Sequence, residues 1–122
     1  MARRESQRLD DILRAVGDLR AFTARMDASA FLADRATQQA CVAALTVIGE
    51  AVKALPLDLR GRHPAIRWAQ WAGLRDFLVH QYFRIDPRRL WRIIERDIPP
   101  LGAAASAELE RIVREDRSET DA

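Results

Sequence analysis

The spacing of apolar residues near the N-terminus is the strongest constraint on how this chain folds. Seven apolar side chains recur at steps of three and four positions: Leu9, Ile12, Leu13, Val16, Leu19, Phe22 and Met26. This spacing places them on one stripe of an α-helix of roughly five turns or more. Ser6 precedes the stripe and is the expected N-cap of the helix.

A second helix is expected between Asp34 and Pro56, where apolar residues again follow helical spacing. Its predicted apolar face contains Cys41, Leu45, Ile48, Val52 and Leu55. Small residues, Gly49 among them, allow another helix to pack closely against it. Cys41 is the only cysteine in the sequence, so no internal disulfide can form, and we interpret its thiol as buried.

Two more helices are predicted after an irregular connection. The first spans approximately residues 68–82. The second has Asp86 as its N-cap and Pro87 as its first residue, and Pro99 and Pro100 kink or restart it. Because long runs of β-branched residues are missing, strands are disfavoured. The expected fold is therefore all-α, an antiparallel bundle of four or five helices.

The charges are unevenly distributed along the chain. Arginine accounts for 19 of the 20 basic residues, and Lys53 is the exception. Nine arginines lie in residues 60–96 against three acidic residues, which is compatible with an anionic partner. The planar guanidinium fork is well suited to binding phosphate. We expect residues 1–115 to form one domain and the acidic residues 116–122 to be a disordered tail.

No segment of the sequence predicts a membrane anchor, a cofactor or a metal site. The apolar runs are shorter than the ~20 residues that span a membrane, and no signal peptide is visible, so a cytoplasmic location is expected. The sequence has no glycine-rich phosphate loop, no pair of cysteines at zinc spacing and no HExxH motif. Its two histidines are too few for a convincing metal site.

The stretch GLRDFLVHQYF, residues 73–83, places Arg75, His80 and Tyr82 within a largely apolar helix. One interpretation is that they lie at the rim of the core with their polar tips in water. A catalytic interpretation requires Arg75 and His80 to converge, although five positions separate them by ~140° around a straight helix. They could converge if the helix ends near His80, or if a second copy of the chain places its own motif opposite.

If they converge, the two residue types can cleave RNA without a metal. A histidine can transfer protons as a general base or acid near neutral pH. An arginine beside it can hold a phosphodiester and stabilise the charge that builds on it. This pair is the minimum for a reaction in which a 2′-hydroxyl attacks the adjacent phosphate.

These residues also carry a resemblance to a known family. Arg75, His80 and Tyr82 match the R-x4-H-x-Y motif of the HepT-like proteins of the HEPN superfamily. Three more segments resemble family blocks in the same order: residues 48–55, 63–68 and 85–99. One departure is Asp76, where many members have asparagine, and it puts a carboxylate beside Arg75.

The resemblance implies an all-helical homodimer whose motifs meet in an interfacial cleft. It implies an endoribonuclease that needs no metal and that is the toxin half of a toxin–antitoxin pair. It also implies a nucleotidyltransferase antitoxin, MntA, which transfers AMP from ATP to Tyr82. Phosphates attached two residues from His80 would fill the cleft and repel an RNA backbone.

Four further residues are candidates for contacts in the cleft or with RNA: Asp76, Glu50, Lys53 and Arg84. Glu50 and Lys53 either face the cleft or form a solvated pair on their own helix. The three tryptophans are interpreted as core or interface, and His63 as structural in its loop. The alternative function is a non-catalytic helical module that docks the nucleotidyltransferase, and Asp76 leaves room for it.

Overall fold

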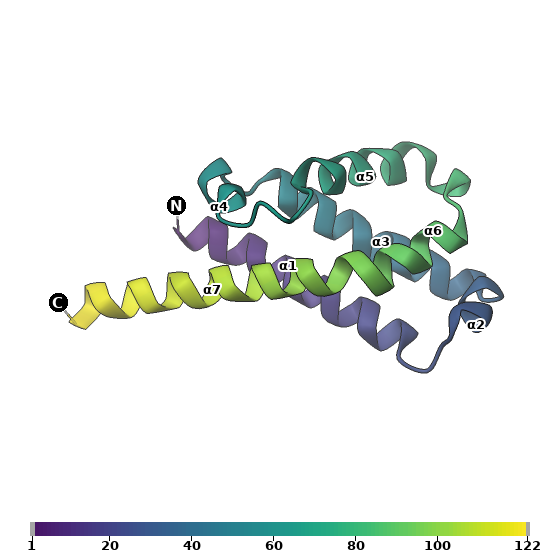
Figure 1. Cartoon of the computed structure of the whole chain (residues 1–122), viewed down its shortest axis with the longest axis horizontal. Coiled ribbons are helices and arrows are strands. Elements are labelled where there is room, and N and C mark those ends of the chain that lie inside the picture. Colours follow the sequence, from purple (N-terminus) through teal and green to yellow (C-terminus); the bar gives the residue numbers. More distant parts are fainter. Residues whose placement is uncertain (1, 122) are drawn as a thin grey trace.

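The computed structural model describes residues 2–121 as a bundle of helices (Figure 1). Its four longest elements are α1 (Ala2–Thr23), α3 (Arg35–Lys53), α5 (Trp68–Gln81) and α7 (Ile98–Asp121). The shorter elements are α2 (Ala28–Leu32), α4 (Leu57–Gly61), the 3₁₀ turn η1 (Tyr82–Arg84), α6 (Pro87–Arg92) and the π-helical turn η2 (Ile93–Asp97). No strand occurs in residues 2–121. The predicted all-α bundle is confirmed.

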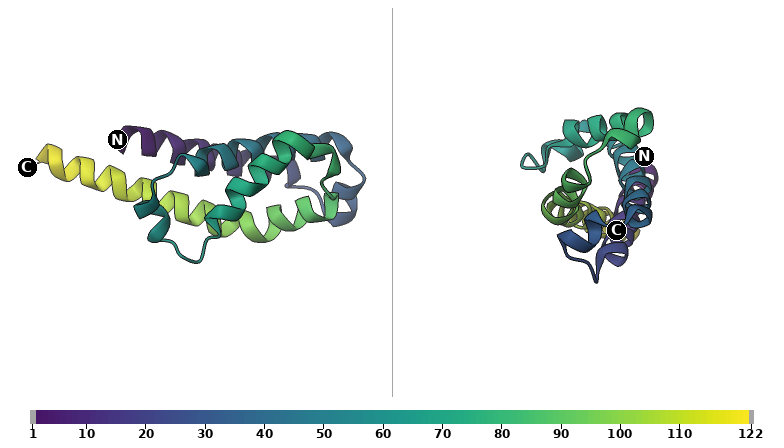
Figure 2. Two further views of the ribbon diagram at one scale, coloured as in Figure 1. Left: turned by 90° about the horizontal axis from the view of Figure 1, so that it is seen from above. Right: turned by 90° about the vertical axis from the view of Figure 1, so that its right-hand side faces the viewer.

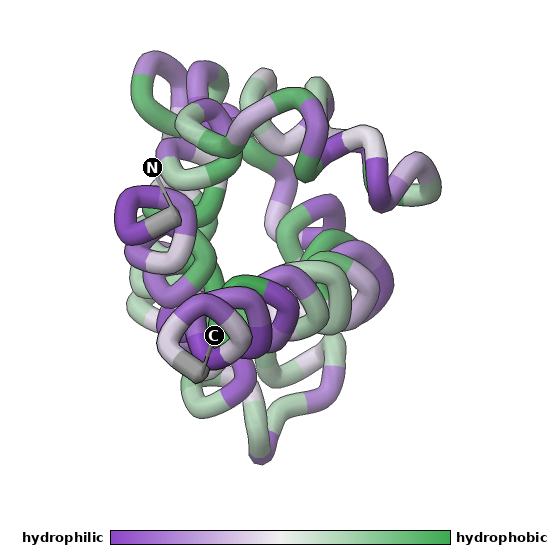
Figure 3. The backbone as a smooth tube through the Cα atoms, turned by 90° about the vertical axis from the view of Figure 1, so that its left-hand side faces the viewer, coloured by the Kyte–Doolittle hydropathy of each residue, from purple (hydrophilic) through white to green (hydrophobic). Residues whose placement is uncertain are grey.

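The core is a single continuous cluster of apolar side chains. Helix α1 packs against α3 and α7, and α3 also packs against α5. Figure 3 shows hydrophobic segments of the tube turned towards the space that the helices enclose. All five residues predicted for the apolar face of α3 are at most 4% exposed. Cys41 belongs to this core, and burial raises the pKa of its thiol to about 11.

The tryptophans belong to the core, as predicted. Trp68 and Trp71 are buried, and the rings of Trp91 and Phe31 lie 5.1 Å apart between centroids. Phe22, in contrast, is exposed although it falls on the predicted stripe of α1. The stripe is therefore correct over most of its length and wrong at Phe22.

Aspartates cap three helices in the structure. The Asp34 carboxylate accepts a hydrogen bond from the Thr37 amide at 2.9 Å and begins α3 where the sequence predicted. Asp86 likewise caps α6, with Pro87 as the first helical residue. The prediction of Ser6 as the N-cap of α1 is wrong, because α1 already begins at Ala2 and the Ser6 hydroxyl donates to the Arg3 carbonyl inside it. Alanine, arginine and glutamate precede Ser6, and all three favour helix.

Helices α6 and α7 join through η2 into one continuous rod (Figure 1). Pro99 and Pro100 lie in the first turn of α7 and lack an N–H, so neither can donate a hydrogen bond to the preceding turn of the rod. The predicted kink or restart at these prolines takes the form of the π-helical turn that directly precedes them.

The last part of α7 differs from the predicted disordered tail. Residues 116–121 continue the helix, and Ala122 lies outside the described residues. Arg111 pairs with Glu115 at 2.7 Å, and the Thr120 hydroxyl donates to the Asp116 carbonyl, so local contacts support these turns. Figure 2 shows this end projecting beyond the rest of the bundle. Among the described helices, none combines the length and apolar character that a membrane span requires.

Candidate active site

The crossing of α3 and α5 positions the predicted motif. A Cβ atom added at Gly49 would collide with the Cβ of Arg75 and lie 3.0 Å from the Trp71 carbonyl oxygen. Only glycine lets the two backbones approach this closely. The small residues predicted to allow close packing of this helix therefore have a specific role at Gly49, which brings Arg75 against α3.

Four charged side chains meet at this crossing, and we call them the Arg75 cluster: Glu50, Lys53, Arg75 and Asp76. Arg75 Nε donates to Glu50 Oε2 at 2.7 Å, and Arg75 Nη1 donates to Asp76 Oδ1 at 3.1 Å. Lys53 Nζ donates to the same Asp76 oxygen at 3.0 Å. Glu50 and Lys53 thus reach across to α5 instead of pairing on α3. The structure brings three of the predicted contact residues together with Arg75.

Hydrogen bonds within the Arg75 cluster favour the charged forms of Asp76 and Arg75. Hydrogen bonds from Lys53 and then Arg75 lower the pKa of Asp76. Hydrogen bonds to Asp76 and Glu50 raise the pKa of Arg75. Two cations therefore balance two carboxylates. Arg75 Nη2 makes no hydrogen bond to any residue from 2 to 121, and the side chain is 26% exposed. This nitrogen is available to an incoming anion.

His80 lies in the last turn of α5, exposed to solvent. The helix continues through Gln81, and no hydrogen bond joins His80 to Arg75 within the described chain. Convergence through an early helix end, one of the two predicted possibilities, is therefore not found. The α-helix does end near His80, because Gln81 has a φ of −141° and a ψ of 31°, but Arg75 reaches sideways to α3.

Tyr82, Phe83 and Arg84 form η1 directly after the motif helix. Tyr82 is 53% exposed, and no described residue hydrogen-bonds to its hydroxyl. The ring of Phe83 meets it edge-on at 5.9 Å, and the Arg84 guanidinium lies 5.8 Å from the Phe83 centroid. Arg84 therefore covers Phe83 and makes no ion pair with the Arg75 cluster. Phe83 and Val79 are themselves exposed, a feature that the apolar sequence pattern did not reveal.

A second group of charged residues was not predicted, and we call it the Glu108 cluster: Arg62, His63, Glu108 and Arg111. Glu108 accepts from Arg62 Nη2 at 2.6 Å, from Arg111 Nε at 3.1 Å, and contacts His63 Nε2 at 2.8 Å. Its side chain is only 5% exposed. Burial alone would raise the pKa of Glu108, but hydrogen bonds from Arg62, His63 and Arg111 outweigh it and lower the pKa to about 2.

The Glu108 cluster anchors the chain that leads into α5. The Trp68 indole N–H donates to the carbonyls of Arg60 and His63, at 3.0 and 3.1 Å. The segment of residues 63–68 is therefore tied both to α7 and to the first turn of the motif helix. This confirms the structural role predicted for His63. In the described part of the chain, no three His, Cys, Asp or Glu side chains gather as ligands for a metal ion.

Comparison with known proteins agrees with this arrangement. The family described as "Ribonuclease HepT-like" matches residues 12–108. A probable ribonuclease HepT of Thermococcus cleftensis is 42% identical over 101 residues, which cover 83% of this chain and 92% of that protein. A putative RNase of Methanocaldococcus jannaschii is 38% identical over 107 residues, which cover 88% and 89%.

A putative RNase of Caldanaerobacter subterraneus is 42% identical over 71 residues, which cover 58% of this chain and 63% of that protein. No solved structure is significantly similar. The fold and motif define an all-helical protein of the HEPN type. The chain belongs to the ribonuclease HepT-like family, which confirms the family and the enzyme class predicted from the sequence.

Proposed function

We propose that this protein is a metal-independent endoribonuclease toxin. It cleaves RNA by promoting attack of the RNA's 2′-hydroxyl group on the adjacent phosphate. The Arg75 cluster supports the proposal, because two hydrogen bonds hold the Arg75 side chain at a helix crossing while Nη2 has no hydrogen-bond partner among the described side chains. His80 is exposed on the same helix, where a substrate can reach it. Family membership supports RNA as the substrate.

The reaction needs only proton transfer and charge stabilisation. A neutral histidine takes the proton of the 2′-hydroxyl, and this oxygen forms a bond to the adjacent phosphorus. The bond from phosphorus to the 5′-oxygen breaks, and the leaving oxygen takes a proton from a protonated histidine. The products are a 2′,3′-cyclic phosphate and a 5′-hydroxyl end. Arg75 Nη2 stabilises the negative charge that builds on the phosphoryl oxygens.

A homodimer supplies both histidines that this scheme uses. One chain carries one His80, whereas the reaction benefits from a base and an acid at the same time. Val79 and Phe83 lie exposed beside the motif, and apolar surface of this kind is typical of a binding interface. We propose that a second copy packs here and brings its own His80 to the cleft.

Tyr82 is the proposed site of inhibition by a nucleotidyltransferase antitoxin. Its hydroxyl oxygen would attack the α-phosphorus of ATP, pyrophosphate would leave, and the phenol proton would be lost. The attached AMP carries about one negative charge and would compete with RNA for the cations of the site. The exposure of Tyr82 and the absence of a hydrogen bond from its hydroxyl to residues 2–121 support this role.

One observation favours the alternative, a non-catalytic module that docks the nucleotidyltransferase. Glu50 and Asp76 already neutralise Arg75 and Lys53, which weakens the attraction of the site for phosphate. A phosphate can reach Arg75 Nη2 directly, but a contact with two guanidinium nitrogens requires that it displaces one of these carboxylates. Since both carboxylates are about half exposed, displacement returns them to water at little cost.

Expression of the protein alone, followed by mapping of RNA ends, separates the two functions. The endoribonuclease hypothesis predicts growth inhibition, new ends with 2′,3′-cyclic phosphates, and cleavage by the purified protein in excess EDTA. Folded, dimeric protein that leaves RNA intact would favour the docking module. Activity that disappears in EDTA and returns with magnesium would contradict the metal-independent mechanism.

The role of Tyr82 is tested by intact mass after incubation with the antitoxin and ATP. The parent protein is expected to gain one or more AMP units, and Tyr82→Phe is expected to gain none while it still cleaves RNA. An equal gain on Tyr82→Phe would move the modification to another residue. If neither protein gains AMP, steric masking of the site by the antitoxin would be the better explanation of inhibition.

A further inference from the structure

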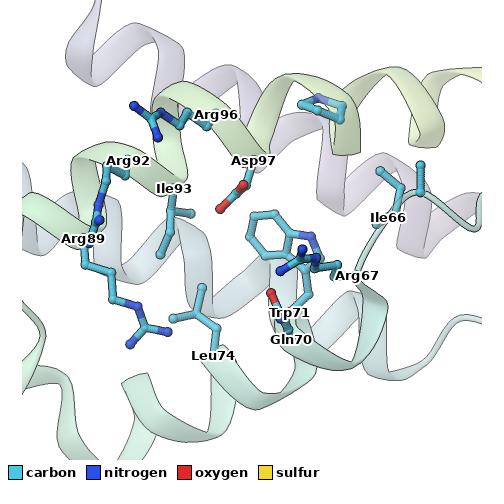
Figure 4. Close-up of a pocket in the computed structure, with 12 residues that line it drawn as sticks. Ile66, Arg67, Gln70, Trp71, Leu74, Arg89, Arg92, Ile93, Arg96 and Asp97 are labelled. Atoms are coloured by element: carbon cyan, nitrogen blue, oxygen red, sulfur yellow. The ribbon is translucent and has the colours of Figure 1, made fainter.

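A pocket of about 410 Å³ lies between α5 and the rod of α6, η2 and α7, away from the motif residues. Figure 4 shows Arg89 and Arg92 along one side, Arg67 across from them, and Trp71 and Asp97 between. The buried residues Trp71, Leu74 and Ile93 form an apolar floor. The volume is that of a site for a small organic molecule.

The positive charges around this pocket have no anionic partners among the described side chains. No side chain of residues 3–120 forms a salt bridge or a hydrogen bond with the guanidinium groups that line it: Arg67, Arg89, Arg92 and Arg96. Arg92 and Arg96 repeat at four residues on one helical rod, a spacing at which like charges disfavour the helix. An anionic ligand would relieve this repulsion.

Arg89 is held in place by an aromatic ring. Its guanidinium lies 5.7 Å from the centroid of Phe77, a side chain of α5. The contact orients the planar fork of Arg89 and leaves its N–H groups for an acceptor. The pocket thus joins an oriented cation to an apolar floor.

The pocket and the Arg75 cluster are formed by different side chains of α5, although Trp71 and Arg75 are neighbours on that helix. Gln70, Trp71 and Leu74 face the pocket, whereas Arg75 and Asp76 reach Glu50 and Lys53 on α3. The Arg75 cluster is neutral overall, while the pocket holds four arginines against Asp97. The two sites are therefore distinct in position and in charge.

We propose that this pocket binds a phosphorylated nucleoside. Its phosphate would bind to the forks of Arg89 and Arg92, and its base would pack on the apolar floor that Trp71, Leu74 and Ile93 form. Gln70 and Asp97 offer hydrogen-bonding groups to the base or ribose. A free nucleotide and one nucleotide unit of an RNA chain share this chemistry. Binding at this pocket requires no cleavage, so it stands apart from the proposed function.

Calorimetric titration of the full chain tests the pocket directly. The probes are the four nucleoside 5′-monophosphates, the matching nucleosides, inorganic phosphate, and a short RNA with 2′-O-methyl riboses that cannot be cleaved. The test variant is Arg89→Gln with Arg92→Gln. The control is Arg114→Gln with Arg117→Gln, which makes the same change in net charge on exposed residues of α7. Circular dichroism confirms that each variant is folded, and Arg67→Gln tests the opposite wall alone.

Removing the two pocket arginines is expected to weaken binding by about tenfold or more, whereas the control should change it by less than about twofold. Unphosphorylated nucleosides and inorganic phosphate should each bind more weakly than a nucleotide. Binding of free nucleotides would identify a small-molecule site, and binding of the RNA alone would identify an RNA subsite. Equal losses in both double variants, or no binding of any probe to the parent, would overturn the proposal.

Discussion

The Arg75 cluster and the Glu108 cluster are built from the same groups but in different surroundings. Each links two helical segments through short contacts between guanidinium and carboxylate groups, at 2.7 Å for Arg75 with Glu50 and 2.6 Å for Arg62 with Glu108. Glu108 is buried under three potential donors, whereas Glu50 and Asp76 are about half exposed.

This difference in burial decides what each cluster can do. Breaking a buried pair leaves a charge without water or partner, so the Glu108 cluster cannot exchange its contacts without loss of stability. Exposed pairs contribute little because water replaces the lost partner. The Arg75 cluster can therefore open for a phosphate, while the Glu108 cluster holds the motif helix in place.

A large effect on activity is expected at Arg75. Arg75→Ala should lower the rate of RNA cleavage by about 10²–10³-fold, because it removes the donor for the phosphoryl oxygens. The melting temperature should change little, since the contacts that are lost are exposed. Cleavage assays and thermal melting on the same preparations measure both quantities. Arg114→Ala, an exposed arginine on α7, is the control and should match the parent. A fully active Arg75→Ala variant would contradict the role of the Arg75 cluster as the phosphate-binding site.

The next largest effect is on stability, at Glu108. Glu108→Gln keeps the shape but removes the charge, and it should lower the free energy of unfolding by about 3 kcal/mol. Urea denaturation at neutral pH provides the measurement. Glu115→Gln removes an exposed carboxylate from the same helix and should change stability by less than about 1 kcal/mol. Similar losses in both variants would mean that burial does not distinguish the two clusters.

The pH dependence of stability also tests the contribution of the buried Glu108 carboxylate. The folded pKa of Glu108 is about 2 against an ordinary value of 4.5, so unfolding takes up a proton as the pH falls. The stability from this ionisation is complete above about pH 5 and is lost progressively towards pH 2. Denaturation curves across this range should show a steeper acid limb for the parent than for Glu108→Gln. Parallel acid limbs would argue against a depressed pKa.

The smallest of these effects concerns the helix crossing that supports Arg75. Gly49→Ala should destabilise the protein by about 1–3 kcal/mol, because its Cβ would collide with Arg75 and force the two helices apart. It should also lower cleavage activity by displacing Arg75. Gly17→Ala is the control, since nothing lies within 4 Å of its added Cβ, and it should stabilise α1 slightly. Denaturation and cleavage assays on both variants check the pair.

Much of the bundle could be predicted because its signals are local. The core face of α3, the caps Asp34 and Asp86 and the start of α6 all follow from neighbouring residues in the sequence. Ser6 failed as a cap because good helix formers precede it, so the helix had no reason to begin there. Small differences in helix propensity of this kind decide where a helix begins.

The candidate site was predictable only in part. Motif spacing identified Arg75, His80 and Tyr82, and their neighbours Glu50, Lys53 and Asp76 were named as possible contacts. Glu108 was not singled out, because its partners Arg62 and His63 lie 46 and 45 residues away. Its spacing from Ala105 and Ile112 was a usable signal, since it places Glu108 on the buried stripe of α7. The basic pocket also depends on packing between α5 and the rod, although the arginine-rich segment of residues 60–96 was compatible with an anionic partner.

The two histidines offer the most direct test, because His63 belongs to the Glu108 cluster and His80 lies on the motif helix that carries Arg75. His80→Gln and His63→Gln are to be compared for RNA cleavage by folded protein and for melting temperature. The account predicts that His80→Gln loses about 10²–10⁴-fold in rate with an unchanged melting temperature. It predicts that His63→Gln melts earlier but cleaves at the parent rate while folded. Parent-like cleavage by His80→Gln, or loss of cleavage by folded His63→Gln, would contradict the assignment of Arg75 and His80 as the active site.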